Sequence, residues 1–401
     1  MRLYFAPNGL GLGHIRRTEA IARRFEQDRH RIIYSTYLDG SEYARREGLP
    51  LVEALSLTYR VKGDGTVDYK ATVASSGLSL GIRKFLRQLG TEIRRIRRFR
   101  PDIILSDSRL SPILAGRLLG IPVILLINQL KVEIVRKPSA EKLTPLSYLF
   151  FFVANIFWIF MSRIIEWAWS LSEVILVPDF PPPYTICLQN LELPPRHLQK
   201  AHFIGPIVEV NPGDLPKLSA LRRRHALPDK PLVYAAISGP KIERRILSSS
   251  LESLFPSLPE GYQFILTKGE PDGERVLEEG NVRTYSWVDD RTQYEFMKAA
   301  DIIISRAGHG IITKSMVYGK KMILIPIPDH TEQWNNARVA QRLGVARIVQ
   351  QEKLDRDVLS NAIRHMIYNC VSSSVQEVYR ESAKLDALDK AAEWIYHLAR
   401  E

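Results

Sequence analysis

Short apolar runs alternate with longer amphipathic stretches along most of the chain. The runs of strand length in the first half are RLYFAP (2–7), HRIIYSTY (30–37), DIILSD (102–107), IPVILLIN (121–128) and EVILVPDF (173–180). Between them, stretches such as residues 16–25 and 111–120 carry apolar positions at helical spacing. Strands that alternate with helices predict βαβ units on a parallel sheet.

A second alternation of the same kind fills the other half of the chain. Its strand-like runs are LVYAAIS (232–238), YQFILTK (262–268), VRTYSW (282–287), DIIIS (301–305) and KMILIPI (321–327). Residues 206–230 separate the two halves and are rich in proline and polar residues, which predicts a linker with one short helix.

The chain is therefore predicted to be an α/β protein with two doubly wound, Rossmann-like domains that face a cleft. We expect an N-terminal domain over 1–205, a linker over 206–230 and a C-terminal domain over 231–375. The helical run 376–401 is expected to pack back across the cleft.

Two segments of the first half depart from this alternation. Residues 83–100 carry eight Lys and Arg, opposed by Glu92 alone, on a helix whose apolar positions recur from Ile82 to Ile96. Residues 144–162 contain no charged side chain, and Trp167 and Trp169 follow them. This uncharged run is just long enough to span a bilayer. The strands on either side of it belong to one domain, however, and a span would place them in different compartments.

An aromatic hairpin over 144–169 that lies in the membrane interface fits these two segments better than a span does. The residues expected to touch an anionic membrane surface are Arg94, Arg95, Arg97, Arg98, Phe151, Trp158 and Trp167. A buried core helix, a homodimer contact and a true span are the alternatives for 144–169.

Charge and cysteine content narrow the classes of function. The formal net charge is +12, and residues 1–205 hold 29 Lys and Arg against 18 Asp and Glu. This half is expected to face an anionic partner, either a membrane or nucleic acid. Nucleic acid is disfavoured because Phe85 and Phe99 lie at apolar helix positions rather than on a basic stacking surface.

The two cysteines, Cys187 and Cys370, form no disulfide framework and lack metal-ligand spacing. With no leader-like start, the chain is expected to be cytoplasmic and peripheral to the membrane.

The stretch SRAGHGIITK (305–314) continues a buried strand into a glycine-rich turn and a helix. A helix N-terminus offers unpaired N–H groups and a positive dipole end, and glycine allows an anion to approach the backbone. The stretch therefore predicts a phosphate cradle. A second turn of this kind, SGPKIERR (238–245), opens the C-terminal domain. Downstream, PDHTEQWNNA (328–337) supplies side chains suited to binding sugar hydroxyls.

Together these motifs resemble the donor-binding signature of GT-B glycosyltransferases. The similarity is greatest to the branch containing the lipid-linked N-acetylglucosaminyltransferase of peptidoglycan synthesis and related archaeal enzymes. NVRTYSWVDDRTQYEFMKAADIIISRAG (281–308) resembles the family's lead-in, in which the nucleotide base stacks near Trp287 and Val288. NGLGLGH (8–14) resembles the glycine-rich loop of the acceptor domain, and HFIGPIV (202–208) resembles the end of that domain.

The resemblance implies a GT-B fold and inverting transfer of a sugar, with N-acetylglucosamine as the first choice, from a UDP-sugar. It implies a polyprenyl- or dolichyl-linked or glycolipid acceptor and no cofactor. No metal is implied, because the one Asp-x-Asp, Asp355–Asp357, falls in a late helix. The donor-binding residues it implies are Gly13, Ser238, Gly239, Lys241, Trp287, Val288, Arg306, Gly308, His309, Gly310, Lys314, Asp329, Glu332, Gln333 and Asn336.

The catalytic base is expected to be His14, with Asp107 at the end of its strand as the orienting carboxylate. A contact from His14 to the donor phosphate or sugar, or a purely capping role, are the alternatives.

One position departs from the resemblance. Lys314 stands where the family has a glutamate that binds the ribose hydroxyls, and a lysine cannot accept those hydrogen bonds. A neighbour takes over that role, the ribose is held differently, or the donor carries additional negative charge.

Two rival functions share these features. A nucleotide-sugar 2-epimerase has the same fold but no use for an interfacial segment. A non-catalytic membrane-recruiting subunit would use the basic and aromatic segments alone.

Overall fold

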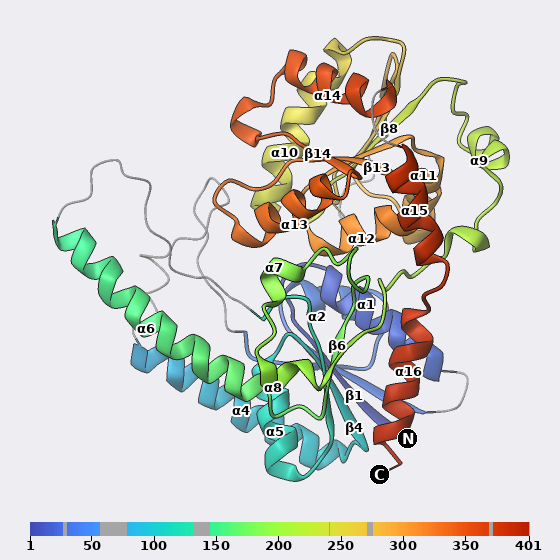
Figure 1. The fold of residues 1–401 in the computed structure, drawn as a ribbon. Helices are drawn as coiled ribbons and strands as arrows, with labels where there is room; N and C mark the ends of the chain where they lie inside the picture. Colours follow the sequence, from blue (N-terminus) through green and yellow to red (C-terminus); the bar gives the residue numbers. More distant parts are fainter. Residues whose placement is uncertain are drawn as a thin grey trace.

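The computed structural model describes residues 1–26, 30–56, 78–130, 145–239, 241–270, 276–368 and 372–400. They form two stacked lobes, and each lobe is built around a seven-stranded sheet (Figure 1). The two doubly wound domains predicted from the sequence are confirmed.

The N-terminal sheet is parallel throughout. Its strands in spatial order are β3 (Leu51–Glu53), β2 (Arg31–Thr36), β1 (Arg2–Pro7), β4 (Ile103–Asp107), β5 (Val123–Leu126), β6 (Val174–Val177) and β7 (Ala201–Phe203). The strand order reverses between β1 and β4, so their carboxyl ends flank a crevice in which ligands bind in open α/β sheets.

The C-terminal sheet repeats this arrangement. Its order is β10 (Val276–Glu279), β11 (Val282–Tyr285), β9 (Gln263–Thr267), β8 (Leu232–Ala236), β12 (Ile302–Ser305), β13 (Lys321–Leu324) and β14 (Ala346–Ile348), with β10 alone antiparallel. The reversal between β8 and β12 places the turns after these two strands at the interface with the other lobe.

Every strand expected from an apolar run is present, and the strands that the sequence did not reveal are the outermost ones. These are β3, β7, β10 and β14, at the four edges of the two sheets. Edge strands are short and partly exposed, and all four residues of β10 are exposed. They therefore lack the continuous apolar run of a strand buried on both faces.

The helices of the N-terminal lobe are α1 (Gly13–Ala22), α2 (Asp39–Arg46), α4 (Leu78–Phe99), α5 (Leu110–Leu119), α6 (Pro145–Trp169), α7 (Leu188–Leu191) and α8 (Pro195–Leu198). Those that follow are α9 (Leu218–Arg224), α10 (Lys241–Leu254), α11 (Asp290–Ala299), α12 (His309–Val317), α13 (Thr331–Arg342), α14 (Arg356–Tyr368), α15 (Ser372–Ser382) and α16 (Ala387–Leu398).

Helix α16 returns the chain to the N-terminal lobe. It lies beside α1, and the two chain termini come close together (Figure 1). Its apolar residues Ala391 and Ile395 pack in one cluster with Phe5 of β1 and Ile15 of α1. The last helix thus connects the two lobes a second time.

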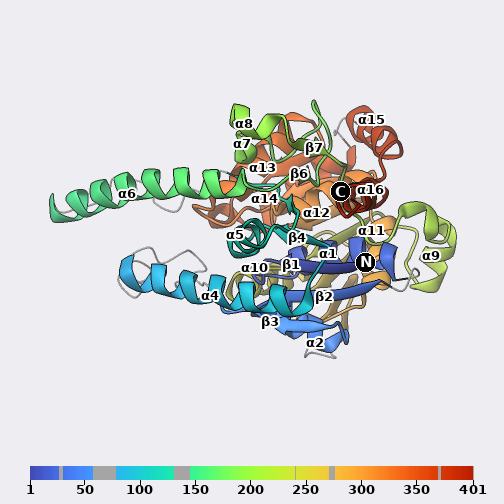
Figure 2. The ribbon, with the colours of Figure 1, turned by 90° about the horizontal axis from the view of Figure 1, so that it is seen from below.

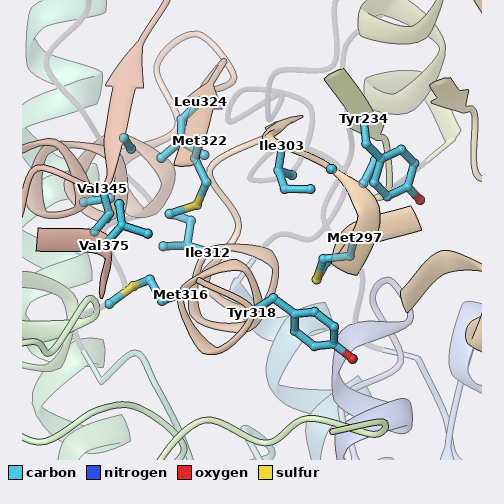
Figure 3. Packing of buried hydrophobic residues seen from close by; sticks show 14 of the residues in the cluster. Tyr234, Met297, Ile303, Ile312, Met316, Tyr318, Met322, Leu324, Val345 and Val375 are labelled. Carbon is cyan, nitrogen blue, oxygen red and sulfur yellow. The ribbon is translucent and has the colours of Figure 1, made fainter. Parts of the chain in front are cut away.

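The core of the C-terminal lobe anchors helix α12. Ile312 and Met316 of α12 pack against Met322 and Leu324 of β13, with Ile303 of β12 beside them (Figure 3). Because one side of α12 is held in this core, its N-terminus has a fixed position at the interface between the lobes.

Helices α4 and α6 extend away from both lobes in the same direction (Figures 1 and 2). The expected aromatic hairpin is wrong, since Pro145–Trp169 is one continuous helix. No glycine or second proline interrupts the segment, and proline is favourable at a first helical position. Trp169 is buried in the core rather than placed for a membrane. Among the described residues, none of the helices combines the length and the apolarity that a membrane crossing requires.

An exposed apolar stripe runs along α6. It consists of Phe152, Val153, Ile156, Ile159, Phe160, Ile164 and Trp167, of which Phe152 and Phe160 are each 64% exposed. Their spacing places them on one face of the helix. The side chains of Phe151 and Trp158, both expected at the membrane, lie outside the described residues.

Glu92 is not part of the exposed face of α4. It is fully buried, pairs with Arg109, and accepts hydrogen bonds from Ser35 Oγ at 2.8 Å and from the Tyr4 hydroxyl. The exposed face is therefore more uniformly basic than the sequence indicated. On that face, Arg83, Arg97 and Arg98 have no carboxylate partner within the described part of the chain.

Replacing Glu92 with alanine should lower the free energy of unfolding by about 3–5 kcal/mol, because Arg109 would remain as a buried, unpaired charge. Urea denaturation followed by circular dichroism measures this change. Arg94→Gln, on the exposed face of the same helix, is the matched control and should change the free energy by less than about 0.5 kcal/mol. Equal effects of the two substitutions would contradict a buried anchoring role.

Candidate functional site

A cavity of about 160 Å³ lies where the two lobes meet. Residues from both lobes line it, namely Gly13, His14, Arg17, Asn128, Pro178, Ile207, His309, Gly310, Thr313, Lys314 and Glu332. They follow strands β1, β5, β6 and β7 on one side and β12 and β13 on the other. The carboxyl ends of both sheets therefore supply the site, as the strand order requires.

The loop before α1 has two glycines that the backbone itself requires. A Cβ at Gly9 would lie 1.9 Å from the carbonyl oxygen of Tyr37, and Gly11 has a φ of +67°. Asn8 ties this loop to the end of β4, because its N–H donates to the Asp107 carbonyl at 3.0 Å. The first residues of α1 are thereby placed next to Asp107.

His14 and Asp107 are brought together as predicted. His14 Nδ1 lies 2.8 Å from Asp107 Oδ1, and the His14 side chain is 26% exposed whereas Asp107 is completely buried. A proton on Nδ1 shared with the carboxylate leaves Nε2 as the acceptor. The pair thus has the arrangement of a general base and its orienting carboxylate.

Arg17 is a third member of this cluster that the sequence reasoning missed. Its Nε donates to Asp107 Oδ2 at 2.6 Å, its Nη1 donates to Asn128 at 3.1 Å, and it also pairs with Asp107 Oδ1. The signal was available, because Arg17 lies three residues after His14 and helical spacing puts both on one face. Burial alone would raise the pKa of Asp107, but Arg17 and then His14 hold it well below its usual range.

The N-terminus of α12 forms the opposite wall of the cavity. Gly308 is its N-cap and supplies no capping side chain. A Cβ at Gly308 or Gly310 would meet no atom within 4 Å, and neither residue has a positive φ. Packing and backbone conformation therefore do not require these glycines. The open space they leave beside unpaired helix N–H groups suits an anionic ligand.

His309 lines the cavity but is buried, and it contacts the other lobe. Its Nε2 lies 3.0 Å from Oδ2 of Asp179, a fully buried carboxylate in the loop after β6. His309, which the sequence predicted as a donor-binding residue, therefore lies at a contact between the lobes. Sequence reasoning missed Asp179, because the two residues are far apart in the chain.

Lys314 has a partner that accounts for its departure from the resemblance. Its Nζ lies 2.6 Å from Glu209 Oε2, and Tyr294 donates to the same carboxylate. Burial would raise the pKa of Glu209, but Lys314 and then Arg16 bring it down to about 2. Burial lowers the pKa of Lys314, which Glu209 partly counteracts. Glu209 belongs to the segment between the lobes, so this pair ties α12 to the linker.

The three expected sugar-binding residues of α13 differ in their surroundings. Glu332 lines the cavity and accepts a long hydrogen bond from Asn128 at 3.4 Å. Gln333 accepts from the Ile327 N–H at 3.1 Å. Asn336 is buried, donates to the Ala307 carbonyl at 3.2 Å and accepts from Asn190 of the other lobe at 2.8 Å. Gln333 and Asn336 thus hold the loops around the cavity.

The remaining expected donor residues do not line this cavity. They are Ser238, Gly239, Trp287, Val288, Arg306, Gly308 and Asp329, and the side chain of Lys241 lies outside the described residues. Trp287 lies against Arg46 of the N-terminal lobe, with the guanidinium 5.1 Å from the ring centre. Val288 packs on the core of the C-terminal lobe.

The second glycine-rich turn contains a carboxyl group that is partly buried. Burial raises the pKa of Glu243 to about 7, against the opposing effect of Arg306. Arg306 donates to the Glu243 carbonyl at 3.1 Å and to the Ile325 carbonyl at 3.2 Å. Arg306 therefore connects this turn to the end of β13 instead of facing the cavity.

Comparison with known proteins agrees with this geometry. The glycosyltransferase family 28 C-terminal domain matches residues 245–391. An uncharacterized glycosyltransferase of Methanosarcina acetivorans is 27% identical over 397 residues, which cover 96% of this chain and 95% of that protein.

Two further matches are a relative that is similar over part of the sequence and a solved structure that is similar in fold. The UDP-N-acetylglucosamine–N-acetylmuramyl-(pentapeptide) pyrophosphoryl-undecaprenol N-acetylglucosamine transferase of Sulfurihydrogenibium sp. is 28% identical over 149 residues, covering 37% of this chain and 42% of that protein. The crystal structure of the calicheamicin glycosyltransferase CalG4 has a TM-score of 0.65 at 16% identity and covers 99% of this chain and 97% of that one. The resemblance and the fold expected from the sequence are confirmed.

The Glu209–Lys314 pair should make stability sensitive to acid. The pKa of Glu209 is about 2 in the folded protein and 4.5 ordinarily, so its stabilisation is complete above pH 4.5 and is lost as the pH falls. Between pH 6 and pH 3 the wild type should lose about 2 kcal/mol more unfolding free energy than Glu209→Gln, as measured by urea denaturation. The exposed-residue control Glu352→Gln should behave as the wild type does. Parallel pH profiles for wild type and Glu209→Gln would refute the pairing.

Proposed function

We propose that the chain is a glycosyltransferase, because residues 245–391 match the glycosyltransferase family 28 C-terminal domain and the fold is of the GT-B type. On that premise we propose an inverting transfer from a UDP-sugar to a lipid-linked acceptor. The transferred sugar that we propose is N-acetylglucosamine, the sugar in the printed name of the Sulfurihydrogenibium relative. One observation carries the proposal: His14, paired with Asp107, and the N-terminus of α12 line one cavity from opposite lobes.

The reaction uses these two walls differently. The diphosphate of the donor binds at the N-terminus of α12, where N–H groups and the helix dipole stabilise the charge that develops as it departs. An acceptor hydroxyl on the other side gives its proton to Nε2 of His14 while its oxygen attacks the anomeric carbon. Attack from the side opposite the leaving diphosphate inverts that carbon. In this scheme backbone N–H groups, rather than a divalent ion, neutralise the leaving group.

Asp107 and Arg17 prepare His14 for this role. The carboxylate fixes the His14 tautomer and stabilises the imidazolium that forms on proton transfer. Arg17 neutralises part of the Asp107 charge when the imidazole is neutral, so that this buried carboxylate is never uncompensated.

We also propose that α4 and α6 bind the cytoplasmic membrane surface, where a lipid-linked acceptor resides. The two helices project in the same direction (Figure 2). Helix α6 carries the exposed apolar stripe and α4 the exposed basic face. Exposed apolar patches of this kind mark interaction sites, and aromatic and basic side chains together suit the interface of an anionic bilayer.

Replacing His14 with alanine should lower kcat by about 10²–10⁴-fold, the usual loss when a general base is removed. Donor affinity, measured by calorimetry with UDP-N-acetylglucosamine, should stay close to that of the wild type. The matched control is His365→Ala, an exposed histidine of α14, which should leave both quantities unchanged. A collapse of donor affinity would make His14 a donor contact, and an unchanged kcat would show that the acceptor needs no base.

Replacing Arg94, Arg97 and Arg98 with glutamine should weaken binding to anionic liposomes by about 10²-fold and reduce its salt dependence, since each cation near the surface contributes about 1 kcal/mol. Phe152→Ser with Phe160→Ser should weaken binding without changing the salt dependence. Co-sedimentation at several salt concentrations measures both effects.

The charge-matched control for this experiment replaces Arg342, Arg347 and Arg380, exposed arginines of the C-terminal lobe, with glutamine. It should bind as the wild type does. If the control variant loses as much binding, the effect comes from net charge rather than from the α4 face. If the Phe152 and Phe160 variant binds as the wild type does, α6 is not part of the membrane contact.

A further inference from the structure

Three side chains with metal-ligating atoms meet where the two lobes touch. A carboxylate oxygen of Asp179, the Sγ of Cys187 and a ring nitrogen of His309 all lie within 4.8 Å of one another, and all three residues are buried. Asp179 and Cys187 belong to the N-terminal lobe, in the loop after β6 and just before α7, while His309 begins α12 of the other lobe. The cluster therefore exists only when the lobes are in contact.

Two backbone N–H groups of the N-terminal lobe fix the position of the Asp179 carboxylate. Its Oδ1 accepts the Phe180 N–H at 2.7 Å and its Oδ2 accepts the Cys187 N–H at 2.8 Å. Each carboxylate oxygen can accept more than one bond, so both keep a lone pair for another partner. The same two bonds position Cys187, whose backbone is tied directly to the carboxylate.

His309 approaches this carboxylate without forming an aligned hydrogen bond. Its Nε2 lies 3.0 Å from Asp179 Oδ2, yet this buried atom has no hydrogen-bond partner of acceptable geometry. A buried polar atom without such a partner is costly. The ring nitrogen is thus directed into the cluster with its bonding capacity unused.

The buried charge of Asp179 must also be balanced. Two arrangements make the cluster neutral: an imidazolium with a protonated thiol, or a divalent cation with a thiolate and a neutral imidazole. The second arrangement requires a metal that binds thiolate strongly enough to displace the thiol proton.

We propose that Asp179, Cys187 and His309 bind a zinc ion that joins the two lobes. A ligand set of one sulfur, one nitrogen and one oxygen suits Zn²⁺, whereas Mg²⁺ and Ca²⁺ prefer oxygen ligands alone. Three protein ligands leave one tetrahedral position for a ligand from solvent.

The ion would hold His309, and with it the start of α12, against the N-terminal lobe. It has no part in the proton transfer assigned to His14. The proposed zinc site does not depend on the proposed transfer function. Its test therefore does not use sugar transfer as a readout.

Cobalt provides the test, because tetrahedral Co²⁺ replaces Zn²⁺ and gives a thiolate-to-metal charge-transfer band in the near ultraviolet. The full chain, freed of metal by dialysis against chelator, should bind Co²⁺ stoichiometrically with this band, and added Zn²⁺ should abolish it. Cys187→Ser should lack the band. Cys370→Ser, which changes the other cysteine of the chain, is the matched control and should keep it.

Thermal unfolding supplies a second readout and a check of folding. Zn²⁺ should raise the Tm of the wild type and of Cys370→Ser but not that of Cys187→Ser or His309→Gln. All four metal-free proteins should have the same far-ultraviolet circular dichroism.

Two results would overturn the proposal. The first is the absence of a charge-transfer band in the wild type, and the second is a band that persists in Cys187→Ser. Either would leave Asp179, Cys187 and His309 as a buried cluster that binds no metal. A donor-binding measurement on the same samples separates this outcome from a failure of the transfer proposal.

Discussion

Buried carboxylates around one cavity organise the interface between the lobes. Asp107 and Asp179 are completely buried, and the side chain of Glu209 is 8% exposed. Each needs a nearby cation because the desolvation of an uncompensated charge is very unfavourable. Asp107 is compensated within its own lobe by Arg17, whereas Asp179 and Glu209 meet His309 and Lys314 from α12. Helix α12 therefore contacts two carboxylates outside its own lobe, and its Lys314 ammonium pairs with Glu209.

This constraint links the anion site to the relative position of the lobes. The core of the C-terminal lobe anchors one side of α12, and its contacts with Asp179 and Glu209 anchor the other. The helix N-terminus can then present its N–H groups to a ligand without further ordering, which is how preorganised electrostatic stabilisation operates. Asn190 strengthens the same interface, because it bonds to both Asn335 and Asn336 of α13. Polar contacts of this kind allow two lobes to separate and rejoin more readily than an apolar interface would.

The two lobes differ in the groups that they contribute to the cavity and in their charge. The excess of Lys and Arg lies in the N-terminal half of the chain. The C-terminal lobe contributes the N-terminal residues of α12 and Glu332 of α13 to the cavity. The N-terminal lobe contributes His14 to the cavity and also projects α4 and α6 outward (Figure 1). These two helices carry exposed basic and apolar side chains. Lys314 at the cavity is largely buried in its ion pair with Glu209, whereas Arg97 and Arg98 on α4 remain exposed.

The sequence by itself determined the local elements and the ends of the strands at which chemistry takes place. Apolar runs predicted the central strands because burial on both faces requires continuous hydrophobicity, and glycines after β1 and β12 marked the functional turns. His14 and Asp107 could be paired because parallel strands place their carboxyl ends together. The single helix over Pro145–Trp169 was also open to prediction, because no glycine or second proline interrupts the segment. Only the tertiary structure decided the edge strands, the partner of Lys314 and the meeting of Asp179, Cys187 and His309. These depend on contacts between residues distant in the chain, and periodicity and spacing describe only a residue's near neighbours.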